Sequence, residues 1–193
     1  MGTLSAGFGV GVSGDINVNT QLRLWVIVSH PIQYHVPTWR ALASREELDF
    51  RVIYFEDKGA RAYQDEEFGQ TVSWDTNLLD GYDSCILREG DPIGHLKACL
   101  DDKSPDVVLI HGFHRPLERR ALRLCKGSKI PILLRSISYN LGSEETLLVR
   151  RLARSLLYQW LLSLPDLLLS IGQYNDEFFR SFGVPAGKLR RIP

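Results

Sequence analysis

Short apolar runs alternate with amphipathic stretches of helical length from residue 22 to the end of the chain. The first run, residues 24–28, is continuously apolar and rich in β-branched side chains, as expected for a strand covered on both faces. Such alternation is typical of β-α-β units, which require a parallel sheet. The chain is therefore predicted to be α/β, with a doubly wound, mostly parallel, Rossmann-like sheet. Expected strands are 24–28, 50–55, 85–87, 107–110, 132–134, 167–171 and 188–192. One helix is expected to start near Pro37, and others to span 93–100, 116–125, 144–163 and 173–182, with Gly127 and Gly183 as helix stops.

One domain accounts for most of the chain. Its 193 residues suffice for one well-buried domain and are short for two, so residues 22–193 are expected to form a single unit. Residues 58–81 are polar and weakly periodic, which indicates a long loop. Residues 1–21 are rich in Gly, Ser and Val and lack the basic region and apolar core of a signal peptide. We expect a disordered leader there, or an extension from a start codon placed too far upstream.

Composition argues against several classes of protein. Lys plus Arg and Asp plus Glu both total 23, so the chain lacks the basic excess of a nucleic-acid binder. No apolar run reaches the about 18 to 20 residues of a membrane span. Cys85, Cys99 and Cys125 are far apart, without a C-x-x-C pair or a recognised Cys/His ligand spacing. We therefore expect no metal site and no disulfide, but reduced, mostly buried thiols in a cytoplasmic protein.

Gly9, Gly11 and Gly14 match the G-x-G-x-x-G spacing of a dinucleotide-binding loop. That loop must follow a strand and open a helix, because the helix N-terminus meets the pyrophosphate. These glycines precede the first expected strand, and residues 15–20 have no helical pattern. A flexible glycine-rich leader is the simpler interpretation, and no dinucleotide cofactor is expected.

Polar residues gather where three of the expected strands end. Ligands of open parallel sheets bind beyond the carboxyl ends of the strands, so these loops are expected to meet at one edge. Their side chains offer directional hydrogen bonds and a stacking face, as a hydroxyl-rich ligand needs. Structural roles stay open for His30 as a strand cap, Tyr34 packed beneath a helix and His111 as a core histidine. The candidate substrate-binding residues are His30, Gln33, Tyr34, His35, His111, Arg135 and Ser136.

The long helix expected over 144–163 carries Arg150, Arg151 and Arg154 among many leucines. Two interpretations fit this pattern. A core-packed helix with a solvated basic side is the simpler one. A helix lying on an anionic membrane surface is the alternative.

Residues 29–35, Ser-His-Pro-Ile-Gln-Tyr-His, resemble the first strand–loop–helix of glycosyltransferase family four, whose members often begin with a similar segment. Residues 39–43 continue the likeness, and the stretch from Asp65 to Tyr82 is similar to the family's next loop. Segments 131–135, 170–172 and 182–185 also resemble family segments, so the likeness covers 22–193.

The resemblance implies a GT-B fold, in which two Rossmann-like domains face each other across a cleft. It implies that this N-terminal domain binds mainly the acceptor, and that transfer retains the anomeric configuration without an essential metal. By position, the loop 30–35 would lie near the donor phosphates and the acceptor, and His111, Arg135 and Ser136 would line the acceptor side. Residues 136–138 are Ser-Ile-Ser, whereas relatives often have a Gly-Asp-Ser-like tip at this place. The acceptor therefore need not be that of those relatives.

The expected function is the acceptor-side half of a retaining glycosyltransferase that moves a sugar from a nucleotide-sugar donor to a glycan or other hydroxyl acceptor. The donor is a co-substrate, and no cofactor is expected. The resemblance places the residues that hold the donor diphosphate in a C-terminal domain that is not among these residues, so the chain is expected to be inactive without that half. The expected location is the cytoplasm, with the inner face of the membrane as an open alternative. A standalone sugar- or partner-binding module and half of a sugar-nucleotide epimerase are the other functions left open.

Overall fold

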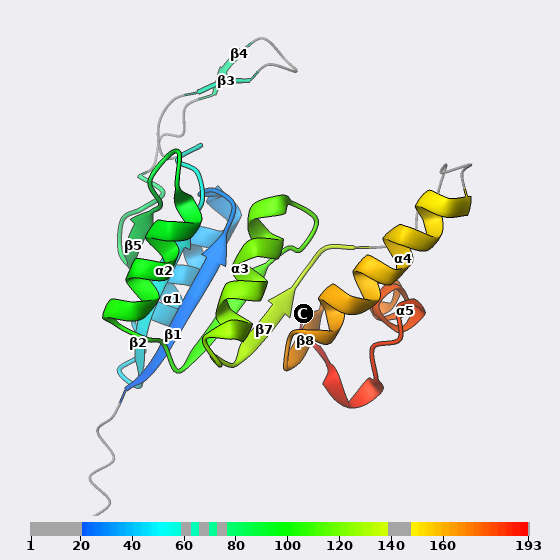
Figure 1. The fold of residues 1–193 in the computed structure, drawn as a ribbon. Coiled ribbons are helices and arrows are strands. Elements are labelled where there is room, and N and C mark those ends of the chain that lie inside the picture. The colour runs from blue at the N-terminus through cyan, green and yellow to red at the C-terminus, as the bar shows by residue number, and fades with distance from the viewer. Residues whose placement is uncertain (1–20, 59–62, 66–69, 73–76, 139–147, 193) are drawn as a thin grey trace, which may run out of the picture.

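The computed structural model describes residues 21–58, 63–65, 70–72, 77–138 and 148–192. Its main sheet has seven strands in the order β5-β2-β1-β6-β7-β8-β9, and every neighbouring pair is parallel (Figure 1). This confirms the predicted doubly wound, Rossmann-like α/β fold. The strands are β1 (Leu22–Val28), β2 (Leu48–Tyr54), β5 (Asp83–Ile86), β6 (Val107–His111), β7 (Ile132–Arg135), β8 (Leu167–Ser170) and β9 (Leu189–Arg191).

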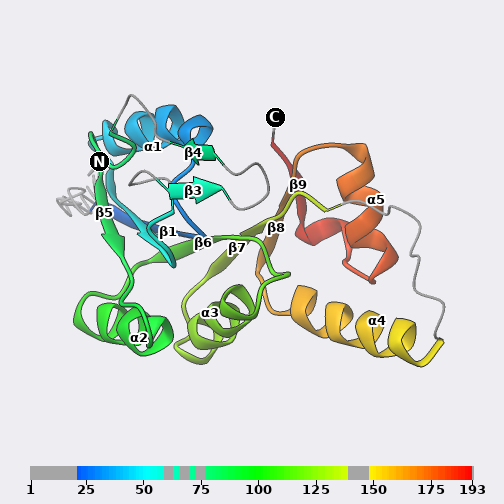
Figure 2. The same ribbon diagram turned by 90° about the horizontal axis from the view of Figure 1, so that it is seen from above.

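Helices connect these strands and cover both faces of the sheet (Figure 2). One face carries α1, and the other carries α2, α3 and α4. Because the central strands are covered on both sides, they read as continuous apolar runs rather than as an alternating pattern. The helices are α1 (Val36–Ala43), α2 (Pro92–Asp102), α3 (Pro116–Gly127), α4 (Leu148–Ser163) and α5 (Gln173–Ser181), with short 3-10 helices η1 (Gln33–His35) and η2 (Ala186–Lys188).

Two apolar clusters fill the space between the sheet and its helices. The smaller cluster surrounds Trp39 of α1 and includes Val26 of β1. The larger one contains Ile27 of β1 together with Leu122 of α3 and Leu161 of α4. Val26 and Ile27 belong to different clusters because successive side chains of a strand point to opposite faces. Each such fully buried side chain contributes about 1.5–3 kcal/mol of hydrophobic stabilisation.

Caps and glycines set several helix boundaries. Asp91 Oδ1 accepts a hydrogen bond of 2.9 Å from Gly94 N and so caps the start of α2. Gly183 follows α5 with a φ of 81°, which confirms the predicted helix stop there. Gly127 was expected to stop α3, but it is the last helical residue. The left-handed conformation falls instead on Lys129, with a φ of 59°.

The segment expected as a long loop, 58–81, contains a short antiparallel pair of strands. β3 (Tyr63–Asp65) pairs with β4 (Gln70–Val72), outside the main sheet (Figure 1). Strands of three residues are too short to show a period in the sequence, which is why the pair was not predicted. The predicted leader, up to residue 20, and residues 144–147 of the predicted long helix lie outside the described residues.

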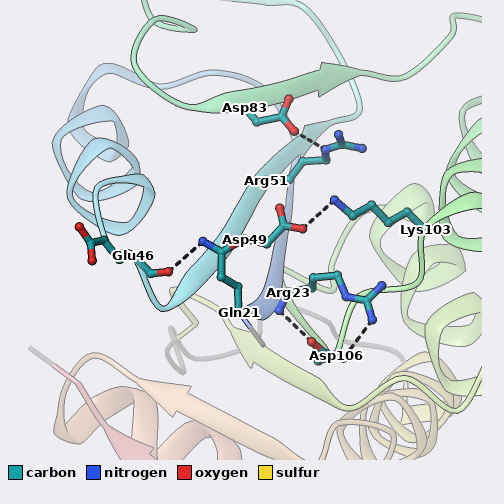
Figure 3. A network of polar contacts seen from close by, with 8 residues as sticks. All are labelled: Gln21, Arg23, Glu46, Asp49, Arg51, Asp83, Lys103 and Asp106. Carbon is teal, nitrogen blue, oxygen red and sulfur yellow. Dashed lines mark hydrogen bonds and ion pairs between the residues drawn. The ribbon is translucent and has the colours of Figure 1, made fainter. Parts of the chain in front are cut away.

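Polar contacts join neighbouring strands on the amino-terminal side of the sheet (Figure 3). Asp106, just before β6, accepts a hydrogen bond of 2.8 Å from Arg23 N and pairs with the Arg23 guanidinium at 3.6 Å. Arg51 of β2 pairs with Asp83 of β5 at 2.7 Å. These pairs are partly exposed, so each ion pair adds at most about 1 kcal/mol. Their contribution is to connect β1 with β6 and β2 with β5.

The long helix α4 is less buried than a core-packed helix. Its buried residues are Leu161 and Leu162, at its C-terminal end. Leu148, Leu152 and Leu156 are between 64% and 74% exposed, and their spacing of four places them on one face. The prediction of core packing therefore holds for the C-terminal part of α4, where the partly buried Leu157 and Tyr158 also pack against the larger cluster. Among the described residues, no helix is long and apolar enough to cross a membrane.

Candidate functional site

The strand order of the main sheet reverses direction between the neighbouring strands β1 and β6. Strands β1, β2 and β5 extend the sheet one way, and β6 to β9 extend it the other way. Residues that follow or end β1, β6 and β7 line a cavity of about 440 Å³ at this place. Ligands of open parallel sheets bind at such a switch point, and the volume suits a small organic ligand.

The loop after β1 brings Tyr34 and His35 to the cavity. It turns through η1 into α1, and Pro37 in the first turn of α1 restricts its backbone. The His35 ring lies 5.3 Å from the ring of Trp39 and 5.1 Å from the ring of His111. Tyr34 is 63% exposed, so its ring offers an apolar face at the rim of the cavity.

The two histidines in ring contact are both held in the neutral form. Burial lowers the pKa of His111 to about 3, and the charges of His35 and Arg135 act in the same direction. Burial also lowers the pKa of His35 to about 4, with Arg135 and His30 adding to the effect. A neutral imidazole has one N–H donor and one acceptor nitrogen. The pair can therefore donate and accept hydrogen bonds at pH 7 without carrying charge.

Three buried polar atoms at the cavity have no hydrogen-bond partner in the described part of the chain. They are His35 Nδ1, His111 Nε2 and Arg135 Nε. Buried polar groups in proteins are nearly always hydrogen-bonded, so three such atoms in adjoining cavity residues are unusual. Their grouping indicates a place where a polar ligand or ordered water completes the hydrogen bonds.

A chain of hydrogen bonds forms the wall of the cavity after β7. Ser136 Oγ and Ser138 Oγ lie 2.6 Å apart, and Ser138 Oγ lies 2.8 Å from His114 Nε2. On its other side, His114 Nδ1 lies 3.1 Å from the Tyr158 hydroxyl. Asn175 Nδ2 donates to the Ser138 carbonyl at 2.8 Å. Because these partners come from four separate segments, the chain fixes the position of the Ser136 hydroxyl.

The N-terminus of α3 is occupied by the protein's own carboxylate. Glu118 Oε2 accepts a hydrogen bond of 2.9 Å from Arg115 N. Burial raises the pKa of Glu118, while hydrogen bonds from the Arg115 and His114 amides oppose that rise. Gly112 makes room for it with a φ of 92°, since a Cβ there would lie 2.7 Å from the carboxyl carbon. The positive end of α3 is therefore already neutralised and is not open to a phosphate.

The cavity brings together most of the residues predicted from the sequence. His30 and Gln33 are not among the residues that line it. The His30 ring faces its neighbour, with Nδ1 3.0 Å from Ser29 Oγ, which agrees with a structural role at the strand end. Gln33 is exposed at the start of η1. The predicted residues that line the cavity are Tyr34, His35, His111, Arg135 and Ser136.

Several lining residues were not among the predicted ones. Glu118 had only a partial signal, because a glutamate at the third helical position is half of the capping-box pattern, while the N-cap residue here is Arg115 in place of the usual Ser or Thr. His114 had none, because its role depends on Ser138 and Tyr158, which are distant in sequence. The lining residues outside the prediction include Thr38, Gly112, His114, Arg115, Glu118 and Ile137.

Neither a family model nor a curated protein matches the sequence. Solved structures match its fold. UDP-N-acetylglucosamine 2-epimerase from Rickettsia bellii has a TM-score of 0.56 and 13% identity, over 89% of this chain and 44% of that one. Another UDP-N-acetylglucosamine 2-epimerase has a TM-score of 0.57 and 16% identity, over 88% and 47%. Anabaena Alr3699/HepE in complex with UDP and glucose has a TM-score of 0.54 and 10% identity, over 89% and 44%.

These similarities have a limited meaning. The chain spans less than half of the length of each of these structures. At identities of 10% to 16% the likeness establishes the fold alone. The described part of the chain is a Rossmann-like α/β unit of the kind found in these structures, two of which are UDP-N-acetylglucosamine 2-epimerases with a GT-B-like fold.

Proposed function

We propose that this chain is the acceptor-side part of a retaining glycosyltransferase that uses a nucleotide-sugar donor, and that the cavity at the β1–β6 switch point binds the hydroxyl-rich acceptor. The observation that carries the proposal is the grouping of His35 Nδ1, His111 Nε2 and Arg135 Nε as buried polar atoms without a described partner. Hydroxyl groups of a sugar both donate and accept hydrogen bonds, so they complement two neutral imidazoles and a guanidinium. Tyr34 supplies a ring for stacking at the rim.

The occupied N-terminus of α3 supports an acceptor role over a donor role. A nucleotide-sugar donor carries a diphosphate, which is commonly bound at an open helix N-terminus. At α3 the Glu118 carboxylate takes that position, and a second anion would be repelled by it. The donor diphosphate is therefore expected to bind to a second Rossmann-like half, and the present chain alone is expected to bind the acceptor without transferring sugar.

A part of a sugar-nucleotide epimerase is the second candidate. It is favoured by the solved structures of similar fold, two of which are described as UDP-N-acetylglucosamine 2-epimerases. In that case the cavity would hold the sugar ring of the nucleotide sugar itself, and free saccharides would have no site of their own.

Saturation-transfer NMR on the full chain separates these two functions. The probes are free mono- and disaccharides, UDP and UDP-N-acetylglucosamine, each tested against the wild type, Arg135→Ala and the matched control Arg45→Ala, which removes an exposed arginine that does not line the cavity. Saccharide signals that disappear in Arg135→Ala and persist in the control support the acceptor site. Signals from UDP-N-acetylglucosamine only, lost in Arg135→Ala, favour the epimerase. Saccharide signals that Arg135→Ala leaves unchanged would rule out the proposed cavity.

A further inference from the structure

A group of metal-ligating side chains lies away from the cavity, between the edge strand β5 and helix α2. It consists of Cys85, His95 and Cys99, each of which offers one ligand atom, and these atoms all lie within 4.8 Å of one another. All three side chains are half-buried, and both thiols are free. The sequence predicted no metal site because it shows no C-x-x-C pair. The ligands come instead from a helix and a strand.

Local structure accounts for the convergence of the three side chains. His95 and Cys99 are four residues apart on α2, so they lie on the same face of that helix. Leu96 and Leu100 are buried in the core and fix the rotation of α2 about its axis. Cys85 is held in register on β5, opposite Ile53 of β2. The arrangement thus depends on the sheet and the core, and the loops contribute little to it.

The donor set has a recognisable preference among metal ions. Two thiolates and one imidazole suit a soft or borderline cation, whereas Mg²⁺ and Ca²⁺ prefer oxygen ligands. In tetrahedral zinc sites, metal–sulfur bonds of about 2.3 Å place two sulfurs about 3.8 Å apart. Ligand atoms already within 4.8 Å reach that spacing by small side-chain rotations. The half-exposed position leaves the fourth coordination site to water or to an incoming ligand.

We propose that Cys85, His95 and Cys99 bind a thiophilic divalent cation of the zinc class. The ion would link the edge strand β5 to α2. This site is independent of the proposed saccharide cavity, which is lined from β1, β6 and β7.

One hydrogen bond changes when the ion binds. His95 Nδ1 accepts a hydrogen bond of 3.0 Å from Arg88 N. Coordination through Nδ1 displaces that bond, and coordination through Nε2 puts the proton on Nδ1, which then cannot accept. Either way the Arg88 amide loses its acceptor. The Arg88 amide resonance therefore reports on occupancy of the site independently of any enzymatic activity.

Titration of the reduced full chain with Zn²⁺, and with Co²⁺ as a spectroscopic probe, tests the proposal. We expect one equivalent of Zn²⁺ to bind with micromolar or tighter affinity, and Co²⁺ to give the thiolate charge-transfer absorption of a tetrahedral site. Cys85→Ser, Cys99→Ser and His95→Gln should each weaken binding at least tenfold. Cys125→Ala is the matched control, because it removes the remaining thiol, which is buried in the core, and leaves all three ligands. The Arg88 amide resonance should shift in the wild type and in this control.

Three results would overturn the proposal. The first is a reduced wild type that binds no Zn²⁺ at micromolar concentrations. The second is binding that survives in His95→Gln and in the serine variants. The third is a Cys85–Cys99 disulfide in the oxidised chain combined with no ion uptake in the reduced chain, which would make the pair a redox site. Circular dichroism without metal checks that each variant is folded. If a serine variant does not fold, the comparison of the wild type with His95→Gln tests the site.

Discussion

Replacing His111 by glutamine removes an imidazole that the fold keeps uncharged. Burial lowers the pKa of His111 to about 3, against an ordinary value of 6.5 in the unfolded chain. Between these two values the unfolded state binds more protons than the native state, so the native state loses stability as the pH falls through this window. For a native pKa well below 5, the change from pH 7 to pH 5 lowers the free energy of unfolding by about 2 kcal/mol.

Glutamine is neutral and polar, so His111→Gln loses this acid-dependent contribution. Urea unfolding at pH 5, 6, 7 and 8 measures the difference. The free energy of unfolding of the wild type should fall between pH 7 and pH 5 by about 2 kcal/mol more than that of the variant. His35 lies in both chains, so its own contribution largely cancels in the comparison. Between pH 7 and pH 8 the two curves should run parallel, which is the internal control. Equal losses in both chains at pH 5 would refute a buried, neutral His111.

Three further predictions concern other parts of the molecule. Gly112→Ala should lower the free energy of unfolding by about 1–3 kcal/mol in urea, because it combines a positive φ with a clash against Glu118; an unchanged stability contradicts the close packing. Asp106→Ala removes one hydrogen bond and one partly exposed ion pair, so the free energy of unfolding should fall by about 1 kcal/mol in the same assay. A much larger fall would show that the substitution disturbs more than these two contacts. If α4 rests on a membrane surface, the wild type floats with anionic vesicles and the double variant Leu152→Glu, Leu156→Glu does not; a wild type that stays at the bottom of the gradient excludes that contact.

The fold could be predicted from the sequence because the apolar runs and amphipathic stretches that indicate strands and helices are local patterns. Residues 24–28 form a short apolar run rich in β-branched side chains, as expected for a strand covered on both faces, and β1 is such a strand in the interior of the sheet. Helix ends were less accurate. Gly127 looked like a stop, but the turn that ends α3 places its left-handed residue at Lys129, two positions later. Glycine permits a left-handed conformation without requiring it.

Only those residues of the candidate site that lie at or directly after strand ends could be predicted from the sequence. Arg135 and His111 end neighbouring strands, so their meeting follows from the parallel topology. The position of His114 depends on side-chain partners in other segments, and no short-range pattern carries that information. The Cys85, His95 and Cys99 group was missed for a similar reason, since one ligand comes from a strand whose distance from α2 is set by the core.

The position of β1 between two strands has a consequence for how the chain acquires its structure. Val26 pairs with Val52 on one side and with Leu109 on the other, so β1 needs a partner that is made much later. Contacts between residues so far apart in sequence slow folding, because a long loop must close first. During synthesis the half-sheet β5-β2-β1 is complete at Ile86, while one apolar edge of β1 stays unpaired until β6 emerges. In that interval the nascent chain is most open to pairing with another copy of itself.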